Sequence, residues 1–142
     1  MNSKTVSNFN NPAQSTGFVF WQTTMTWQRL INRSLSPYKI THMQFVVLAV
    51  IYWLSQTKSE INQQDIAKYS KIDKMQISST LSILEKKELV SRIQGQIDTR
   101  VKKITLTKQG LELVQKAIPV VEKTDSEFFS KEAEINLPKK TL

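Results

Sequence analysis

The chain has no cysteine, a single histidine and only three glycines among its 142 residues. Without cysteine it has no disulfide, no cysteine-ligated zinc and no thiol redox sensor or nucleophile. The one histidine, His42, lacks partners at the spacing that a metal site or a catalytic triad requires. Three glycines form no phosphate-binding loop. We therefore expect no metal, no cofactor and no catalytic site, which disfavours a small enzyme.

Long hydrophobic runs are also missing. The longest, residues 45–54, is about half of the roughly 20 residues that a membrane-spanning helix needs, so it predicts a buried core helix. The first 16 residues are polar and lack the apolar centre of a signal peptide. We expect no membrane segment.

Acidic residues are scarce relative to basic ones. Twenty Lys and Arg face twelve Asp and Glu, which gives a net charge of +8. This balance predicts a polyanionic partner, nucleic acid first and an anionic membrane surface second. Residues 65–108 carry ten basic and five acidic side chains, a net charge of +5 that fits a phosphate footprint.

What the sequence does contain is a series of helix signals. Apolar residues cover more than one face of residues 18–35, which predicts a helix that packs against its own domain on one side and against a second subunit on the other. The Ser-Pro pair at 36–37 ends this helix. A capping box of Thr41 and Gln44 opens the apolar helix, which ends near Ser55.

Two shorter helices follow. Residues 60–61 are compatible with a short strand, and Asn62 then caps a helix that ends near Ser70. Asp73 begins the next helix, residues 73–87. Its predicted buried stripe, at spacings of four and three, consists of Ile77, Leu81 and Leu84.

A hairpin and a long helix complete the chain. Residues 89–93 and 100–106 predict two strands around a glycine-containing loop. Thr107 caps the last helix, and Pro119 predicts that this helix is kinked or split. A near-heptad apolar seam along it consists of Leu111, Val114, Ile118, Val121 and Phe128. The fold class is therefore mainly α with a small β-hairpin wing, a winged helix-turn-helix with N- and C-terminal dimerisation helices.

The outer face of the helix at 73–87 suits the major groove of double-stranded DNA. Its side chains are small hydrogen-bonding groups that let the backbone approach, whereas a merely solvated face usually carries more Glu and Lys. Gln76 can bond an adenine edge, and Met75 can touch a thymine methyl group. The predicted DNA-binding residues of this helix are Lys74, Met75, Gln76, Ser78, Ser79 and Ser82.

The hairpin tip suits the minor groove. Arginine is favoured in narrow A/T grooves, where the negative potential is deep, so Arg100 is predicted to bind there. Asp98 is predicted to orient its guanidinium group, and Lys102 to contact phosphate. The alternative for Asp98 and Arg100 is a local ion pair worth less than ~1 kcal/mol.

These motifs together resemble the MarR family of bacterial transcriptional regulators. The resemblance runs from about residue 18 to residue 130, and its most specific part is the wing followed by Leu-Thr-X-X-Gly. It is carried by residues 40–45, 72–79, 84–92, 98–100 and 106–110. It implies an obligate homodimer whose terminal helices interlock, a recognition helix at 73–87, palindromic operators and release by small, often phenolic, ligands.

The sequence departs from the family pattern at three points. Glu88 stands where many members have glycine after the recognition helix. Ser79 stands where many carry arginine. The cysteine of the redox-sensing branch is absent.

The resulting hypothesis is a cytoplasmic, dimeric, ligand-responsive repressor. We expect a flexible arm at 1–15, an N-terminal dimerisation helix at 16–37, a DNA-binding lobe at 38–107 and one or more C-terminal dimerisation helices at 108–142. An aromatic or phenolic effector would use Trp21, Met25 and Phe45, although such aromatic clusters are more often core. The alternative function is a winged-helix protein-interaction or architectural DNA-binding module without effector control.

Overall fold

The computed structural model describes residues 6–131 and confirms the predicted fold class, a mainly α winged helix-turn-helix with one two-stranded hairpin. Residues 1–5 and 132–142, which belong to the predicted arm and to the predicted C-terminal dimerisation segment, lie outside the described residues. The elements are η1 (Pro12–Gln14), α1 (Thr16–Leu35), η2 (Ser36–Tyr38), α2 (His42–Ser55), α3 (Gln63–Ser70), α4 (Lys74–Lys86), β1 (Val90–Gln94), β2 (Lys102–Leu106) and α5 (Lys108–Lys131).

The helix starts follow the predicted capping residues. Thr41 Oγ1 accepts the N–H of Gln44 at 3.2 Å, and the Gln44 side chain accepts the N–H of Thr41 at 3.2 Å. Asn62 opens α3 through the same reciprocal bonds with Asp65, at 3.0 and 2.9 Å. Asp73 caps α4 by accepting the N–H two residues further on, at 3.0 Å. These bonds satisfy donors that a helix N-terminus otherwise leaves unpaired.

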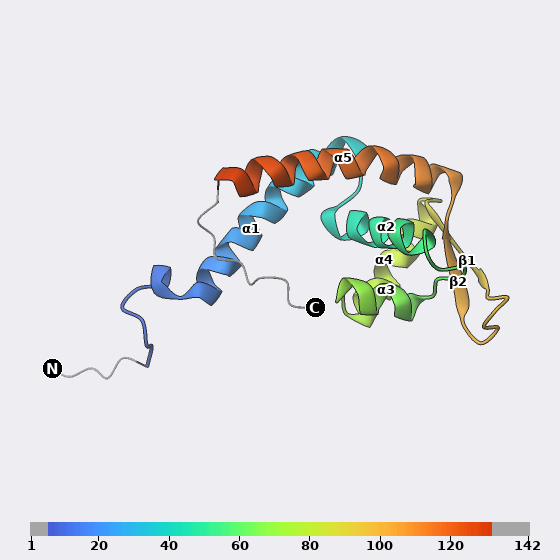
Figure 1. Cartoon of the computed structure of the whole chain (residues 1–142), viewed down its shortest axis with the longest axis horizontal. Coiled ribbons are helices and arrows are strands. Elements are labelled where there is room, and N and C mark those ends of the chain that lie inside the picture. Colours follow the sequence, from blue (N-terminus) through green and yellow to red (C-terminus); the bar gives the residue numbers. More distant parts are fainter. Residues whose placement is uncertain (1–5, 132–142) are drawn as a thin grey trace.

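One apolar core holds the lobe together. In Figure 1, α2, α3 and α4 lie beside the hairpin, and α5 passes over the lobe. The predicted stripe of α4 is fully buried. The largest fully buried side chains come from both terminal helices, all three central helices and β2: Ile31, Leu35, Leu48, Ile51, Ile66, Ile77, Leu81, Leu84, Ile104, Val47 and Val114.

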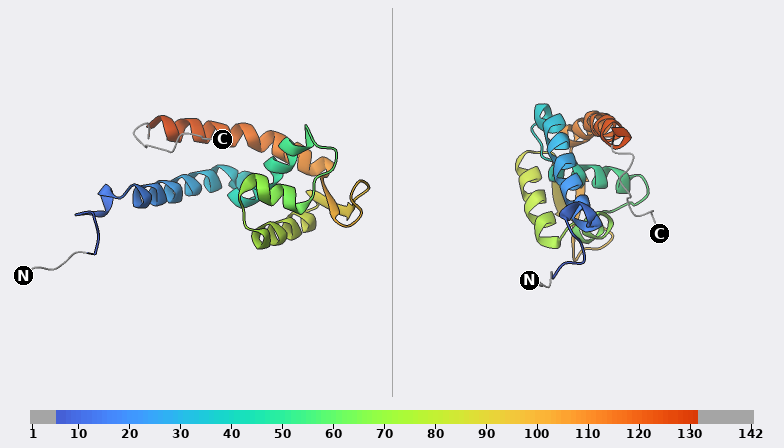
Figure 2. Two further views of the ribbon diagram at one scale, coloured as in Figure 1. Left: turned by 60° about the horizontal axis from the view of Figure 1, so that its bottom comes forward. Right: turned by 90° about the vertical axis from the view of Figure 1, so that its left-hand side faces the viewer.

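Helices α1 and α5 leave the lobe side by side, as Figures 1 and 2 show from different directions. Their contact includes polar bonds: Trp27 Nε1 donates to Asp125 Oδ1 at 2.7 Å, and the hydroxyls of Ser34 and Thr124 lie 2.7 Å apart. His42, the first residue of α2, packs edge-on against Trp27 with ring centroids 4.8 Å apart. Burial lowers the pKa of His42, an effect that the charge of Asp125 partly opposes.

Two sequence-based expectations were wrong. Residues 60–61 form no strand, because a single backbone-to-backbone bond, from Ile104 N to Ile61 O at 2.7 Å, pairs them with the hairpin. Of the kink or split predicted at Pro119, the split is wrong, since α5 is one helix from Lys108 to Lys131. Pro119 is exposed, whereas Ala117 and Val121 on either side of it are buried in the packed face. Packing of this face retains the helix despite the lost backbone donor.

The turn after α4 contains the most informative departure from the family pattern. Glu88 has φ 61°, in the left-handed region that glycine occupies most easily. Its N–H donates to Glu85 O at 3.0 Å, and the N–H of Leu89 donates to Leu84 O at 2.9 Å. This is the Schellman pattern of helix termination, with a glutamate in the position usually given to glycine.

The start of α5 is locked against the same turn. Thr107 Oγ1 accepts the N–H of Gly110 at 3.0 Å and donates to Glu88 O at 2.7 Å. The N–H of Thr107 donates to Leu89 O at 3.0 Å. A Cβ atom at Gly110 would overlap the carbonyl group of Leu89. The Leu-Thr-X-X-Gly motif therefore consists of a cap and a close backbone approach.

We expect Glu88→Gly to stabilise the protein by about 0.5–1 kcal/mol. Relief of left-handed strain, roughly 1–2 kcal/mol, exceeds the extra backbone entropy that glycine loses on folding. Urea denaturation measures the change in the free energy of unfolding. The same substitution within a helix, Glu112→Gly in α5, is the control and should destabilise by about 1 kcal/mol. If Glu88→Gly lowered the free energy of unfolding, the left-handed backbone of Glu88 would not be a source of strain.

Candidate nucleic-acid interface

Helix α4 presents one exposed polar face. Its buried side chains Ile77, Leu81 and Leu84 point into the core, so the opposite face is directed to solvent. Met75 is 80% exposed. The exposed predicted DNA-binding residues on this helix are Lys74, Met75, Gln76, Ser78 and Ser79. The structure thus brings five of the six together on one accessible surface.

The sixth residue, Ser82, is half-buried and faces the hairpin. Its hydroxyl donates to Ser78 O at 3.1 Å and accepts from Arg92 Nη2 at 3.3 Å. The same Arg92 atom donates to Glu85 Oε1 at 3.0 Å. This hydrogen bond from Arg92 is the main reason why the pKa of Glu85 lies below its ordinary value. Arg92 of β1 therefore ties the hairpin to α4, a connection that sequence reasoning missed because it depends on tertiary packing.

Asp98 and Arg100 form a bidentate ion pair at the wing tip. Arg100 Nε lies 3.0 Å from Asp98 Oδ1, and Nη2 lies 3.1 Å from Oδ2. The backbone N–H of Arg100 also donates to Asp98 Oδ1, at 3.1 Å. The side-chain bond, followed by the backbone bond, lowers the pKa of Asp98. Arg100 remains 87% exposed, so its guanidinium group is held in place and is accessible.

A second carboxylate at the wing was not predicted as a site residue. Glu60 accepts the N–H of Gln96 at 2.6 Å, that of Ile97 at 3.0 Å to each oxygen, and that of Asp98 at 3.4 Å. Burial opposes ionisation of Glu60, but these backbone bonds and the charge of Lys103 outweigh it and lower the pKa. The sequence gives no signal for this contact, because Glu60 lies 36 to 38 residues before the amides that it binds.

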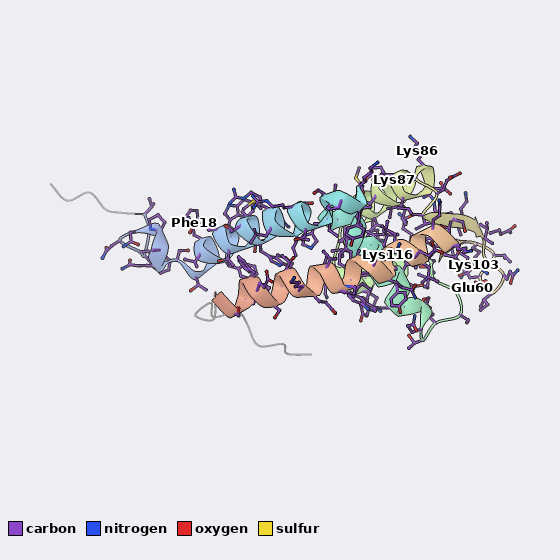
Figure 3. All side chains as sticks on the ribbon, turned by 90° about the horizontal axis from the view of Figure 1, so that it is seen from above. Phe18, Glu60, Lys86, Lys87, Lys103 and Lys116 are labelled. Carbon is purple, nitrogen blue, oxygen red and sulfur yellow. The ribbon has the colours of Figure 1, made fainter. Side chains whose placement is uncertain are left out.

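Basic side chains surround this surface. Lys102 is exposed on β2, and Lys103 is half-buried beside it. Figure 3 shows Lys103 and Glu60 together at the wing end, and Lys86 at the end of α4. The exposed α4 face and the wing therefore form a basic surface with an arginine at its tip, which suits binding to a phosphate backbone.

The predicted effector residues are not gathered in one enclosed pocket of the single chain. Phe45 is buried in the lobe core, whereas Trp21 is 59% and Met25 is 36% exposed on α1. Within residues 6–131, no three His, Asp or Glu side chains are grouped so that they could hold a metal ion. No helix in the described part of the chain combines the length and the hydrophobicity needed to cross a membrane.

Comparisons with known proteins relate this chain to transcriptional regulators. The family model of the ArnR1-like winged-helix domain matches residues 36–123. The uncharacterized HTH-type transcriptional regulator YdcH of Bacillus subtilis (strain 168) is 36% identical over 124 residues, which cover 87% of this chain and 84% of YdcH.

Solved structures have the same fold. A mutant MarR from E. coli complexed with operator DNA has a TM-score of 0.75 and 25% identity, with 88% of this chain and 87% of that chain covered. CouR from Rhodococcus jostii RHA1 bound to p-coumaroyl-CoA has a TM-score of 0.75 and 23% identity, with 92% and 85% covered.

Proposed function

This chain belongs to the winged-helix transcriptional regulators, with an ArnR1-like winged-helix domain and a MarR-like fold, and we propose that it is a ligand-responsive repressor that binds a palindromic operator as a dimer. The observation that carries the proposal is the exposed small-residue face of α4 beside a wing with a fixed arginine at its tip. Such a surface can place a helix in the major groove and an arginine in the adjacent minor groove.

Each part of the surface has a distinct role in this proposal. Met75, Gln76, Ser78 and Ser79 read base edges, while Lys74 and Lys102 contact phosphates. Arg100 enters the minor groove, and Asp98 orients it. Ser82, whose hydroxyl is bonded to Arg92, supports the recognition surface from its edge.

We expect Arg100→Ala to weaken operator binding by roughly 30- to 1000-fold while the free energy of unfolding changes by less than about 0.5 kcal/mol. The dimer loses two minor-groove arginines, each worth ~1–2 kcal/mol. Gln76→Ala should instead change preference at one base pair per half-site, at a cost of about 1–3 kcal/mol. The measurement is titration of a selected operator at fixed salt, with circular dichroism as the folding control. Near-wild-type affinity of Arg100→Ala would remove the wing from the mechanism.

Dimerisation is proposed from the apolar surface of α1. Phe18, Phe20, Trp21 and Met25 are exposed on the part of α1 that projects away from the lobe, and Figure 3 places Phe18 at the end opposite the wing. Several large apolar side chains exposed on one stretch of a helix favour an interaction site. Because the proposed operator is palindromic, a second copy is the partner that the symmetry requires.

We expect sedimentation at micromolar concentration to give about twice 16.4 kDa. Trp21→Glu should shift the protein toward monomer and weaken operator binding, because a charge would be buried in the interface. Trp53→Glu is the matched control, since Trp53 is 45% exposed on α2 rather than on α1, and it should remain dimeric. A monomeric wild-type protein that binds DNA tightly would contradict the dimer.

Effector control is proposed from the position of the same apolar residues. Association of two α1 helices would enclose Trp21 and Met25, and the buried end of α1 continues from them into the lobe whose core contains Phe45. A ligand there could change the spacing of the two recognition helices, which a palindrome tolerates poorly. CouR, which has this fold, binds p-coumaroyl-CoA.

We expect at least one aromatic or phenolic acid to raise the melting temperature of the wild-type protein and to release the operator. Trp21→Ala should reduce both effects, because it removes part of the pocket wall. Thermal shift and operator titration with the same compounds provide the two measurements. Uniform absence of both effects would favour the alternative, a winged-helix interaction or architectural module without effector control.

A further inference from the structure

We propose that Glu60 is a positioning residue that holds the wing in the orientation in which Arg100 meets DNA. The inference rests on the proposed DNA-binding function and adds a residue from outside the wing and the recognition helix. Glu60 lies between α2 and α3, two residues before the cap of α3. It belongs to the helix-turn-helix part of the lobe rather than to the hairpin.

The contact is a convergence of backbone donors on one carboxylate. The N–H groups of Gln96, Ile97 and Asp98, three consecutive residues, all point to Glu60, at distances from 2.6 to 3.4 Å. Successive N–H groups that face the same side form a concavity for an anion. Hydrogen bonds to a charged acceptor are about twice as strong as neutral ones. In this concavity the anion is the carboxylate of Glu60.

The same turn determines where the arginine lies. Asp98 donates its N–H to Glu60, while its carboxylate holds both Nε and Nη2 of Arg100. Within the hairpin, the turn is closed at its base by Gly95 N to Val101 O at 3.0 Å. Glu60 provides the connection from the turn to the body of the lobe. A continuous series of bonds therefore runs from Glu60 through the turn backbone and Asp98 to Arg100.

Glu60 also lies next to a second bond between the lobe and the hairpin. Ile61 O accepts the N–H of Ile104 at 2.7 Å, which fixes the middle of β2 beside the segment before α3. The Glu60 contact lies further along the hairpin, toward its tip. The Ile61 and Glu60 contacts hold the hairpin at two points along its length, and together with the bonds of Arg92 to α4 they set the direction of the wing relative to α4.

The negative charge of Glu60 and its positioning role have opposite effects on DNA affinity. Removal of a negative charge near a phosphate-binding surface strengthens DNA binding when charge alone matters. Loss of wing positioning weakens it, because the arginine must then be ordered at the moment of binding. Glu60→Gln removes the charge with little change of shape, so the two explanations predict opposite results.

The DNA probe is a duplex selected by the wild-type protein from a randomised library. At fixed salt we expect Glu60→Gln to bind this duplex about 10-fold more weakly, equivalent to roughly 1.4 kcal/mol. Arg100→Ala should show its larger loss, and the double variant should bind no more weakly than Arg100→Ala alone. The control Glu112→Gln removes an exposed charge from α5 and should bind as tightly as wild type or slightly more tightly.

The DNA-independent measurement is an amide NMR titration. In the wild-type protein, the amide signals of Gln96 and Ile97 should move together with a midpoint below the ordinary range of a glutamate pKa, since the bonds to Glu60 persist until its carboxylate is protonated. Glu60→Gln should lack this transition while retaining the one from Asp98. Circular dichroism should confirm that the variant is folded.

The outcomes separate the inference from the proposed function. If Glu60→Gln binds as tightly as Glu112→Gln, or if its loss adds fully to that of Arg100→Ala, the positioning role is wrong while DNA binding stands. If Arg100→Ala binds like wild type, the positioning role is also wrong, because no arginine needs to be positioned. If the wild-type protein selects no duplex, the proposed function itself fails and the inference fails with it.

Discussion

The carbonyl and amide groups of Leu89 form the junction on which the arrangement of this molecule depends. Its N–H ends α4 by bonding to Leu84 O, and its C=O accepts the N–H of Thr107 just before α5. Gly110 is required there because any side chain would overlap this carbonyl group. One residue thus joins the end of α4, the start of the hairpin and the start of α5. Buried backbone groups must be paired, so none of the three elements can shift without breaking a bond.

This junction explains how distant parts of the proposed regulator can influence one another. Helix α5 runs from Leu89 and Thr107 at the hairpin to its contact with α1, where Asp125 bonds Trp27. A helix packed along its length moves largely as a rigid body, because a close-packed interior resists continuous deformation. A change in the angle between α1 and α5, in a dimer or with a ligand, would therefore be transmitted to α4. For a palindromic operator, the relevant quantity is the spacing of two such helices.

The sequence predicted the parts of the fold that local chemistry determines. Thr41 and Asn62 cap helices through bonds that span three residues, and the spacing of Ile77, Leu81 and Leu84 identifies the buried side of α4. The same reasoning identified Asp98 and Arg100, which are two residues apart. It missed Glu60 and Arg92, whose partners are brought near by the fold. It overestimated the helix-breaking effect of Pro119. The local cost of a proline is opposed by packing on the other side of the helix, and no local sequence pattern reveals that packing.

The acidic residues of this basic lobe suggest that general attraction to DNA and discrimination between DNA sequences depend on different side chains. Glu60, Glu85 and Asp98 all have lowered pKa values, so each stays charged at neutral pH on a surface proposed to bind a polyanion. Each is also bonded to protein donors: the turn amides, Arg92 and Arg100. Their negative charges weaken the general electrostatic attraction to DNA. The net charge of the chain is nevertheless +8, so this attraction remains. In return, Glu60, Glu85 and Asp98 hold the turn, Arg92 and Arg100, respectively, in place. A donor that is already fixed loses less entropy on binding than a mobile one. Lysines that only attract can remain mobile, whereas the groups that discriminate between sequences must be held.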